Sequence, residues 1–310
     1  MQESNLTKVT EFFLLGFQGN QDFRIFLFCL LLVIYCGTIC GNLLIITLVS
    51  TSRNLHTPMY FFISQLSISD ILVISDIVPY MLHILLNNGR NITLIECITQ
   101  LYFLAASESS ECFLLGMMSY DRYVAICNPL RYSTIMTNRH CVILSITCWL
   151  FAFSTLSIYI IQTAKLNFCG SNIINHLFCD FLPLLELACS EVFIIHLEMY
   201  LLSIPTVIIP ITIIVISYVY IVSAVLKIPS STSRQKAFST CSSHLIVVSL
   251  YYWTMFSVYI VPTKERTLTM SKILSLLYTV FTPLVNPIIY SLRNTDIQKA
   301  VQETWAKLMI

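Results

Sequence analysis

Charged side chains are rare in this 310-residue chain, so each acid or base within an apolar stretch is a candidate for chemistry. Charged residues make up 11% of the sequence, whereas a soluble protein carries about 25%. Asp70, Glu108 and Glu111 lie within apolar stretches, and Asp121 and Arg122 end one of them. A carboxylate in such a place can bind a cation, share a proton with a second acid or form an ion pair. These residues are the first candidates for a functional site.

Four cysteines offer a second kind of chemistry, disulfide formation. Cys169, Cys179 and Cys189 lie in the longest connection between apolar stretches. Cys97 begins another apolar stretch, at the end that lies on the same face of the expected bundle as this connection. In an oxidising compartment four thiols can form two disulfides, in three connectivities. The remaining cysteines are predicted to act as small apolar side chains.

Catalytic, metal and nucleic-acid chemistry are not indicated. The six histidines are scattered, and no nucleophile or metal signature is visible. His176, Cys179 and Asp180 have a metal-like spacing, but an oxidised Cys179 supplies no thiolate, so we expect no metal there. A formal net charge of +1 provides no basic field for phosphates. We therefore expect no enzyme, no resident cofactor and no nucleic-acid partner.

Membrane-spanning helices must position these residues, because the mean hydropathy is +0.79 and 56% of the residues are hydrophobic. A helix that crosses the hydrocarbon core needs about 20 apolar residues. Five uncharged stretches are long enough, and two more are interrupted by a few charged residues, most of them acids. The expected spans are 25–52, about 58–86, about 97–123, 140–164, 199–226, 237–263 and 273–292.

The predicted fold is all-α, a seven-transmembrane helix bundle that forms one domain over 1–310. Most Lys and Arg residues flank the spans on the side that holds Arg131 and Arg234, which is typical of cytoplasmic loops. The N-terminus is then outside. The segment 1–24 is extracellular, 25–292 holds the spans and loops, and 293–310 is a cytoplasmic tail with a short amphipathic helix. Asn5 and Asn91 begin glycosylation sequons on the outer side.

Short motifs stand at fixed ends of these spans. They are Gly41-Asn42, Pro58-Met59-Tyr60-Phe61-Phe62, Leu66-Ser67 with Asp70, Met118-Ser119-Tyr120-Asp121-Arg122-Tyr123-Val124-Ala125-Ile126-Cys127, Ser217-Tyr218, Lys236-Ala237-Phe238-Ser239-Thr240-Cys241-Ser242-Ser243-His244-Leu245 and Pro283-Leu284-Val285-Asn286-Pro287-Ile288-Ile289-Tyr290-Ser291-Leu292-Arg293-Asn294. A single tripeptide is a weak signal, but the ordered set is very specific. Over essentially its whole length the chain resembles the olfactory receptors, a branch of the rhodopsin-like G-protein-coupled receptors.

The resemblance implies an odorant receptor in the plasma membrane of olfactory sensory cilia. Such a receptor binds a small, mostly apolar volatile ligand within the bundle and activates a stimulatory G protein of the olfactory type, which raises cyclic AMP. A non-olfactory chemoreceptor of the same family is the alternative, because the motifs do not identify the tissue. A transporter is a more distant alternative, since no inverted repeat or broken helix is visible.

The resemblance also implies roles for the charged residues and the cysteines. Cys97 is expected to pair with Cys179, and Cys169 with Cys189. The interior polar network is expected to comprise Asn42, Asp70, Glu111 and Asn286, and some family members place a sodium ion near the two acids. A purely structural network is the alternative, because buried polar groups need partners in any case.

The resemblance implies that at the cytoplasmic end Asp121 holds Arg122 in a closed arrangement, which opens on activation when the sixth span swings outward. The expected coupling and switch residues are Asp121, Arg122, Tyr123, Tyr218, His244, Asn286, Pro287 and Tyr290.

Helical steps outward from Arg122 place one wall of the ligand pocket on the third span, at Leu104, Ala105, Glu108, Ser109 and Cys112. Opposing faces of the fifth, sixth and seventh spans offer Leu202, Ser203, Thr206, Tyr252, Tyr259, Tyr278 and Thr279. An ionised Glu108 favours a cationic or strongly donating ligand, whereas a neutral Glu108 donates to a carbonyl or hydroxyl group. Pairing of Glu108 within the protein is the alternative. Trp253 stands where the family usually has glycine, which would alter the upper part of this pocket.

Overall fold

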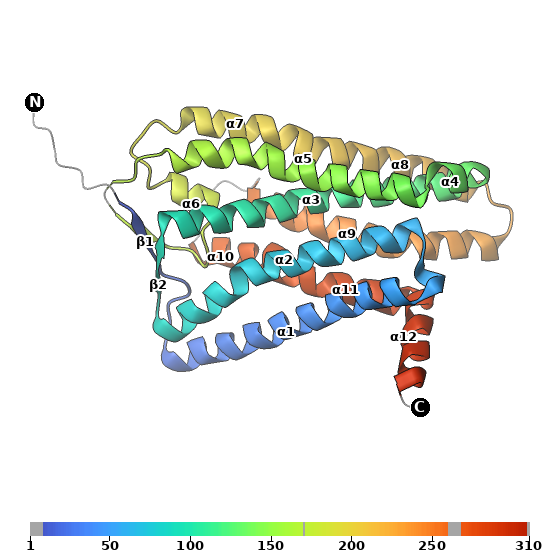
Figure 1. The fold of residues 1–310 in the computed structure, drawn as a ribbon, viewed down its shortest axis with the longest axis horizontal. Helices are drawn as coiled ribbons and strands as arrows, with labels where there is room; N and C mark the ends of the chain where they lie inside the picture. Colours follow the sequence, from blue (N-terminus) through green and yellow to red (C-terminus); the bar gives the residue numbers. More distant parts are fainter. Residues whose placement is uncertain (1–8, 170, 260–267, 309–310) are drawn as a thin grey trace, which may run out of the picture.

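The computed structural model describes residues 9–169, 171–259 and 268–308. Within these ranges, seven helical rods lie side by side, with the strands at one end of the bundle and the C-terminal helix at the other (Figure 1). The rods are α1 (Gln21–Thr51), α2 (Pro58–Asn87), α3 (Leu94–Cys127), α5 (Asn138–Ala164), α7 (Phe193–Ser203) continued through η2 (Ile204–Ile208) into α8 (Ile209–Leu226), α9 (Ser231–Tyr259), and α10 (Leu268–Leu276) continued through η4 (Leu277–Phe281) into α11 (Thr282–Arg293). The seven-helix prediction is confirmed.

Five of the rods are long and apolar enough to cross a membrane by length and composition alone, within the described residues. They are α1, α2, α5, the rod from α7 to α8, and most of the rod from α10 to α11. Although α3 has 34 residues, Glu108, Glu111 and a run of serines lower its hydropathy. The sixth expected span reaches residue 263, and its last part lies outside the described residues.

Prolines account for the irregular turns in two rods. Pro210 and Pro283 each follow a turn of π-helix, η2 and η4 respectively. Proline has no N–H to donate and its ring crowds the carbonyl four residues earlier, so the preceding turn must widen. The Thr282 hydroxyl donates to the carbonyl oxygen of Leu277 at 3.2 Å and so satisfies one backbone acceptor of η4. Both rods therefore contain an irregular turn within the bundle, next to a proline.

A small sheet covers the outer end of the bundle, which the all-α prediction missed. Strand β1 (Glu11–Leu14) pairs antiparallel with β2 (Arg90–Thr93) and parallel with β3 (Ile173–Ile174). Phe12 and Leu14 of β1 are fully buried beneath the connection between α5 and α7, where the short helix α6 (Phe181–Leu185) also lies. Strands of two to four residues have too few side chains to produce a recognisable alternation.

The cytoplasmic end carries α4 (Pro129–Ile135) and α12 (Thr295–Leu308), and α12 turns away from α11 to run crosswise to the rods beside the end of α1 (Figure 1). Ile297 and Ala300 of α12 are buried against the bundle, whereas Trp305 is exposed. This is the amphipathic helix expected in the tail. The hydroxyl of Tyr60, at the start of α2, donates to Asn294 Oδ1 at 2.9 Å and lies 3.1 Å from Asp296 Oδ2, which ties α12 to the bundle.

Candidate functional site

Two disulfides fix the outer end of the molecule. Cys97 is joined to Cys179, and Cys169 to Cys189, the pairing that the resemblance implies. Gln100, one turn after Cys97, accepts a hydrogen bond from the Cys179 N–H at 2.9 Å and donates to the carbonyl oxygen of Asp76 at 3.1 Å. Gln100 thus joins α2, α3 and the outer connection. Sequence reasoning missed it, although a polar side chain one turn from a predicted disulfide was a usable signal.

A buried lysine connects the N-terminal segment to the last rod. The ammonium group of Lys272 donates to the carbonyl oxygen of Gly16 and to Asn175 Oδ1, both at 2.6 Å. Beside it, Nε2 of His176 shares a hydrogen bond of 3.2 Å with the Ser275 hydroxyl. Sequence reasoning treated Lys272 only as the charge that bounds the seventh span, so this contact was missed. The cluster holds the outer connection over the helix ends.

His176 makes this outer cluster sensitive to pH. Burial lowers the pKa of His176 from its ordinary value of 6.5, the charge of Lys272 acts in the same direction, and Asp180 opposes both. The native protein therefore keeps His176 neutral at a pH where the unfolded chain already binds a proton. Because the unfolded state then holds more protons, the free energy of unfolding falls as the pH drops below about 6.5.

We expect the purified receptor to unfold at a lower temperature near pH 5.5 than near pH 7.5, and His176→Gln to reduce this difference. His83→Gln is the matched control, because His83 is exposed near the outer end of α2. Thermal unfolding of the three proteins at the two pH values measures the effect. An equal pH dependence in wild type and His176→Gln would contradict the role of His176.

Four acids of the outer half carry a buried oxygen atom without a partner among the described residues: Asp76 Oδ2, Glu108 Oε1, Glu111 Oε1 and, on α7, Glu198 Oε2. Glu108 lies close enough to Glu111, Asp76 and Asp180 for their charges to interact. The main-chain oxygen of Glu108 accepts a hydrogen bond from the Tyr251 hydroxyl at 2.8 Å, but Oε1 of its carboxylate has no donor in the described part of the chain. A buried acid without a partner is costly, so this group of acids is suited to a donor or cation from outside the protein.

The predicted pocket residues divide by their exposure. Leu104, Cys112, Thr206, Tyr252 and Thr279 are buried, and Ala105, Glu108, Ser109, Leu202 and Tyr278 are partly buried. Ser203 is exposed and donates to the Tyr200 carbonyl on its own helix, so its place in the pocket was wrong. Trp253 is 64% exposed, which shows that it lies on the outside of the bundle and does not fill the upper cavity. The side chain of Tyr259 lies outside the described residues.

Tyr251 was missed in the pocket prediction, which chose its neighbour Tyr252. Its hydroxyl lies 3.2 Å from Cys112 Sγ, in addition to its bond to the Glu108 carbonyl. These two contacts join α9 to α3 at the level of the acids. The run Tyr251-Tyr252 left the orientation of each ring ambiguous, because the sequence alone does not fix the rotation of the helix.

The interior network is centred on Asp70, which is fully buried. The side-chain amide of Asn286 donates to both of its carboxylate oxygens, at 3.0 and 3.2 Å. Glu111 is close enough to Asp70 for their charges to interact. Asn42 departs from the expectation: its amide donates to the carbonyl oxygens of Thr38 and Pro283. Asn42 thus supplies the hydrogen bond that the Pro283 carbonyl oxygen cannot receive from Pro287, which has no N–H. Among the described residues it makes no hydrogen bond with the acids.

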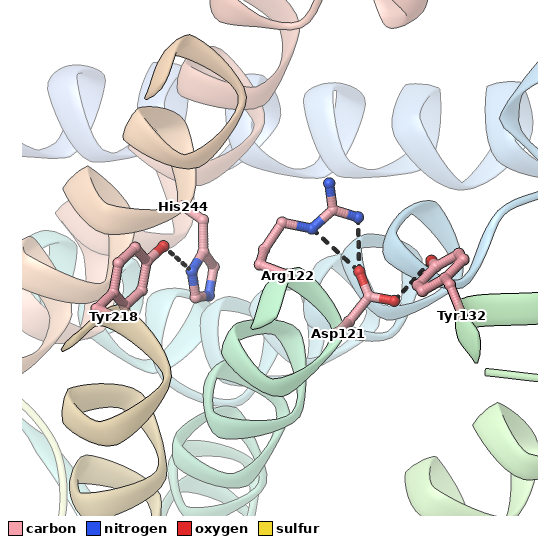
Figure 2. Close-up of polar contacts among 5 residues, drawn as sticks. All are labelled: Asp121, Arg122, Tyr132, Tyr218 and His244. Atoms are coloured by element: carbon pink, nitrogen blue, oxygen red, sulfur yellow. Dashed lines mark hydrogen bonds and ion pairs between the residues drawn. The ribbon is translucent and has the colours of Figure 1, made fainter. Parts of the chain in front are cut away.

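The Asp121–Arg122 pair lies at the cytoplasmic end of α3 (Figure 2). Arg122 Nη2 and Nε donate to Asp121 Oδ2 at 2.6 and 3.0 Å, and the Tyr132 hydroxyl donates to the other carboxylate oxygen at 2.8 Å. Asp121 is fully buried and the Arg122 side chain is 14% exposed. The arginine is therefore held on its own helix. Tyr132 of α4 was missed because its loop was read only for charge.

Two tyrosines face this pair from other helices. The Tyr218 hydroxyl of α8 forms a 2.8 Å hydrogen bond with Nδ1 of His244 on α9, while Arg122 turns toward Asp121 (Figure 2). The Tyr290 hydroxyl is buried with no hydrogen-bond partner among the described residues, and its ring is near Tyr218 and Arg122. Tyr123 packs against Tyr220 with ring centroids 5.7 Å apart. Four helices thus bring the expected switch residues together.

Pro287 packs against α1 at Gly41. A Cβ atom added at Gly41 would lie 3.3 Å from the proline ring, so glycine allows the two helices to approach closely. This contact joins the first and last rods beside the interior network. Asn5 lies outside the described residues, and Asn91 is exposed on β2.

Comparisons with known proteins agree with these observations. The sequence model of a family described as "Olfactory receptor" matches residues 28–307. Human olfactory receptor 11L1 is 46% identical over 98% of this chain and 94% of its own length. The mouse olfactory receptor 5AP2 is 45% identical over 98% of this chain and 96% of its own length. The mouse olfactory receptor 5G9 is 41% identical over 100% of this chain and 99% of its own length.

Proposed function

Because the chain belongs to the olfactory receptor family, we propose that it binds a small, mostly apolar volatile molecule within the helix bundle and activates a stimulatory G protein of the olfactory type. The family is one of multi-pass membrane receptors and is not enzymatic. The proposal covers the ligand type, the G protein and a location in olfactory sensory cilia. The observation that supports it most directly is a set of acids in the outer half, each with one buried oxygen that lacks a partner among the described residues, above a closed arginine in the cytoplasmic half.

The outer half supports a ligand that is apolar over most of its surface and has one polar end. Leu104, Thr206 and Thr279 are buried on three rods of this half, and small-molecule sites are mostly apolar with a few placed polar groups. Glu108 lies on α3 among them, 14 residues before Arg122, which is about 21 Å along a helix. Its unpartnered Oε1 is suited to a ligand amine or hydroxyl group.

We therefore expect Glu108→Gln to weaken amine agonists by roughly 10- to 100-fold, because a hydrogen bond to a charged group is worth about 1.5 to 3 kcal/mol. Ketones should shift much less, since they cannot donate. The measurement is a dose–response curve of cyclic AMP for amines, alcohols and ketones. Glu303→Gln is the matched control, because it makes the same change at an exposed position of α12. Equal responses of Glu108→Gln and wild type to every class, at equal expression, would place Glu108 in the structural network.

The experiment that tests the proposed function itself is an odorant panel on cells that express the chain with the olfactory stimulatory G protein. Ligand-dependent cyclic AMP is the expected result. Transcript localisation in the olfactory epithelium separates this proposal from a chemoreceptor in another tissue. A ligand response that proceeds only through a different G protein would contradict the proposed G protein, but it would still support the proposed ligand site.

We also propose that a sodium ion is held near Asp70 and Glu111. Asp70 has both oxygens directed at Asn286, and Glu111 retains an unpartnered Oε1, so the two acids can supply oxygen ligands. The ion would reduce the repulsion between two buried negative charges. Within the described residues no group of three His, Cys, Asp or Glu side chains is placed to hold a metal, so serine oxygens or water would complete the coordination.

A further inference from the structure

A cavity of about 460 Å³ lies between α8 and α9 at their cytoplasmic ends, far from the predicted ligand pocket. Its inner wall is apolar: Ile221, Val225 and Cys241 are buried, and Tyr218 packs against them. A volume of this size is within the range of small-molecule sites, about 300 to 1,000 Å³. The remaining lining residues are Val222, Leu226, Ser231, Arg234, Gln235, Ser242 and Leu245.

The cavity opens sideways, toward the surface of the bundle that faces the bilayer. Val222, Leu226 and Leu245 line it and are 51%, 66% and 39% exposed. In a membrane-spanning bundle an exposed apolar side chain contacts lipid tails. The cavity is therefore a groove that continues from the buried wall to the lipid phase, and an acyl chain can enter it without crossing water.

The cytoplasmic rim of the groove is basic and has no acidic counterpart. Arg234 lines it, and Lys227 directly follows α8 in the short connection to α9. No Asp or Glu occurs between Glu198 and Glu265. Within the described ranges Arg234 forms no ion pair. Ser231 begins α9 at the same rim, so the positive end of a long helix adds to the field.

We propose that this groove binds an anionic phospholipid of the inner leaflet, with an acyl chain along Ile221 and Val225 and the phosphate at Arg234. An amphiphile with one anionic end matches an apolar wall and a cationic rim. The inner leaflet is rich in anionic lipids, which attract basic residues near the membrane surface. A protein segment or a second copy of the chain would not necessarily bring a negative charge to this basic rim, whereas an anionic lipid always does. The inference depends on membrane insertion and not on the odorant or the G protein.

The test uses the full-length receptor, purified in detergent and exposed to mixed micelles of phosphatidylserine and phosphatidylcholine, with bound lipid counted by native mass spectrometry. Wild type should retain phosphatidylserine in preference to phosphatidylcholine. Arg234→Ala should weaken this retention about fivefold, since a basic residue near the surface contributes about 1 kcal/mol. Val222→Trp should abolish it, because the indole fills the mouth of the groove.

Matched controls separate the groove from general effects. Arg131→Ala removes the same charge from α4, on the same face of the membrane, and Val219→Trp adds the same ring to α8 at an exposed position that does not line the groove. Both should behave as wild type. If Val222→Trp does not reach the membrane, Arg234→Glu replaces it as the test of phosphatidylserine retention. The Arg234 side chain is exposed, so this variant should still fold.

Three outcomes would overturn the inference. Equal retention of phosphatidylserine by Val222→Trp and Val219→Trp would place the lipid elsewhere. Equal loss of phosphatidylserine retention in Arg234→Ala and Arg131→Ala would show that the retention depends only on the overall charge of the cytoplasmic face. Binding of soluble glycerophosphoserine as tightly as the whole lipid would show a simple anion site without a role for the apolar wall.

Discussion

Arg122→Ala is expected to abolish agonist-evoked cyclic AMP. In the closed arrangement the guanidinium group bonds Asp121 on its own helix, and Tyr218, His244 and Tyr290 surround the space beside it without bonding it. An arginine that changes partners between two states can bias a two-state equilibrium. Removing it removes the cation that a G protein would meet when α9 moves. Cyclic AMP per receptor at the cell surface, counted by antibody, measures the loss.

The structure adds a cost to this variant. Asp121 is fully buried and would retain only Tyr132 as a partner, and an uncompensated buried charge costs about 3 to 5 kcal/mol. Surface expression should therefore fall as well. Asp121→Asn with Arg122→Ala removes both charges and should recover expression but not signalling. Normal signalling in either variant would show that the pair only anchors the end of α3.

Cys97→Ser or Cys179→Ser should prevent delivery to the cell surface. Both cysteines are fully buried, and their disulfide closes a separation of 82 residues between α3 and the outer connection. Chain entropy assigns roughly 4.5 kcal/mol to a loop of this length, and roughly 3.3 kcal/mol to the Cys169–Cys189 separation of 20 residues. A native domain is stable by only about 5 to 15 kcal/mol, so loss of the longer tie should have the larger effect.

Surface antibody staining measures this effect for all four cysteines. Cys29→Ser is the control, because Cys29 is a free, exposed cysteine on α1. The expected order is full delivery for Cys29→Ser, reduced delivery for Cys169→Ser and none for Cys97→Ser. Alkylation followed by mass spectrometry that found Cys97 and Cys179 as free thiols would contradict the prediction.

The sequence predicted the rods and their order because long uncharged stretches have one stable form in a bilayer, the helix. It also placed Asp121 and Arg122 together, since adjacent residues need no tertiary information. The contacts of Gln100, Lys272 and Tyr132 were not predictable in the same way. Each depends on how a helix end meets a loop that is distant in sequence, and a single polar residue has several candidate partners there.

Helix rotation explains the errors in the pocket. Ser203 was placed on the inward face of its span, but the π-turn η2 directly after it changes the angular position of its neighbours. On α9 it is the Tyr251 hydroxyl that contacts α3. A wider turn alters the rotation per residue, so an ideal helical count fails there. Pro205 and Pro210 indicate from the sequence that this rod is irregular, but they do not determine which way the side chains on either side of the irregular turn face.

The sheet at the outer end has a consequence for the biogenesis of the protein. Strand β1 leaves the ribosome first, but it lies between β2 and β3, so its second partner is synthesised only after the fourth span. On the luminal side of the endoplasmic reticulum, β1 therefore cannot complete its pairing until residues 173–174 have been translocated. Pairings between segments that are distant in sequence also form slowly. During that interval Phe12 and Leu14 lack the outer connection that buries them in the folded protein. Export of this receptor is thus expected to be limited by completion of its outer end rather than by insertion of its helices.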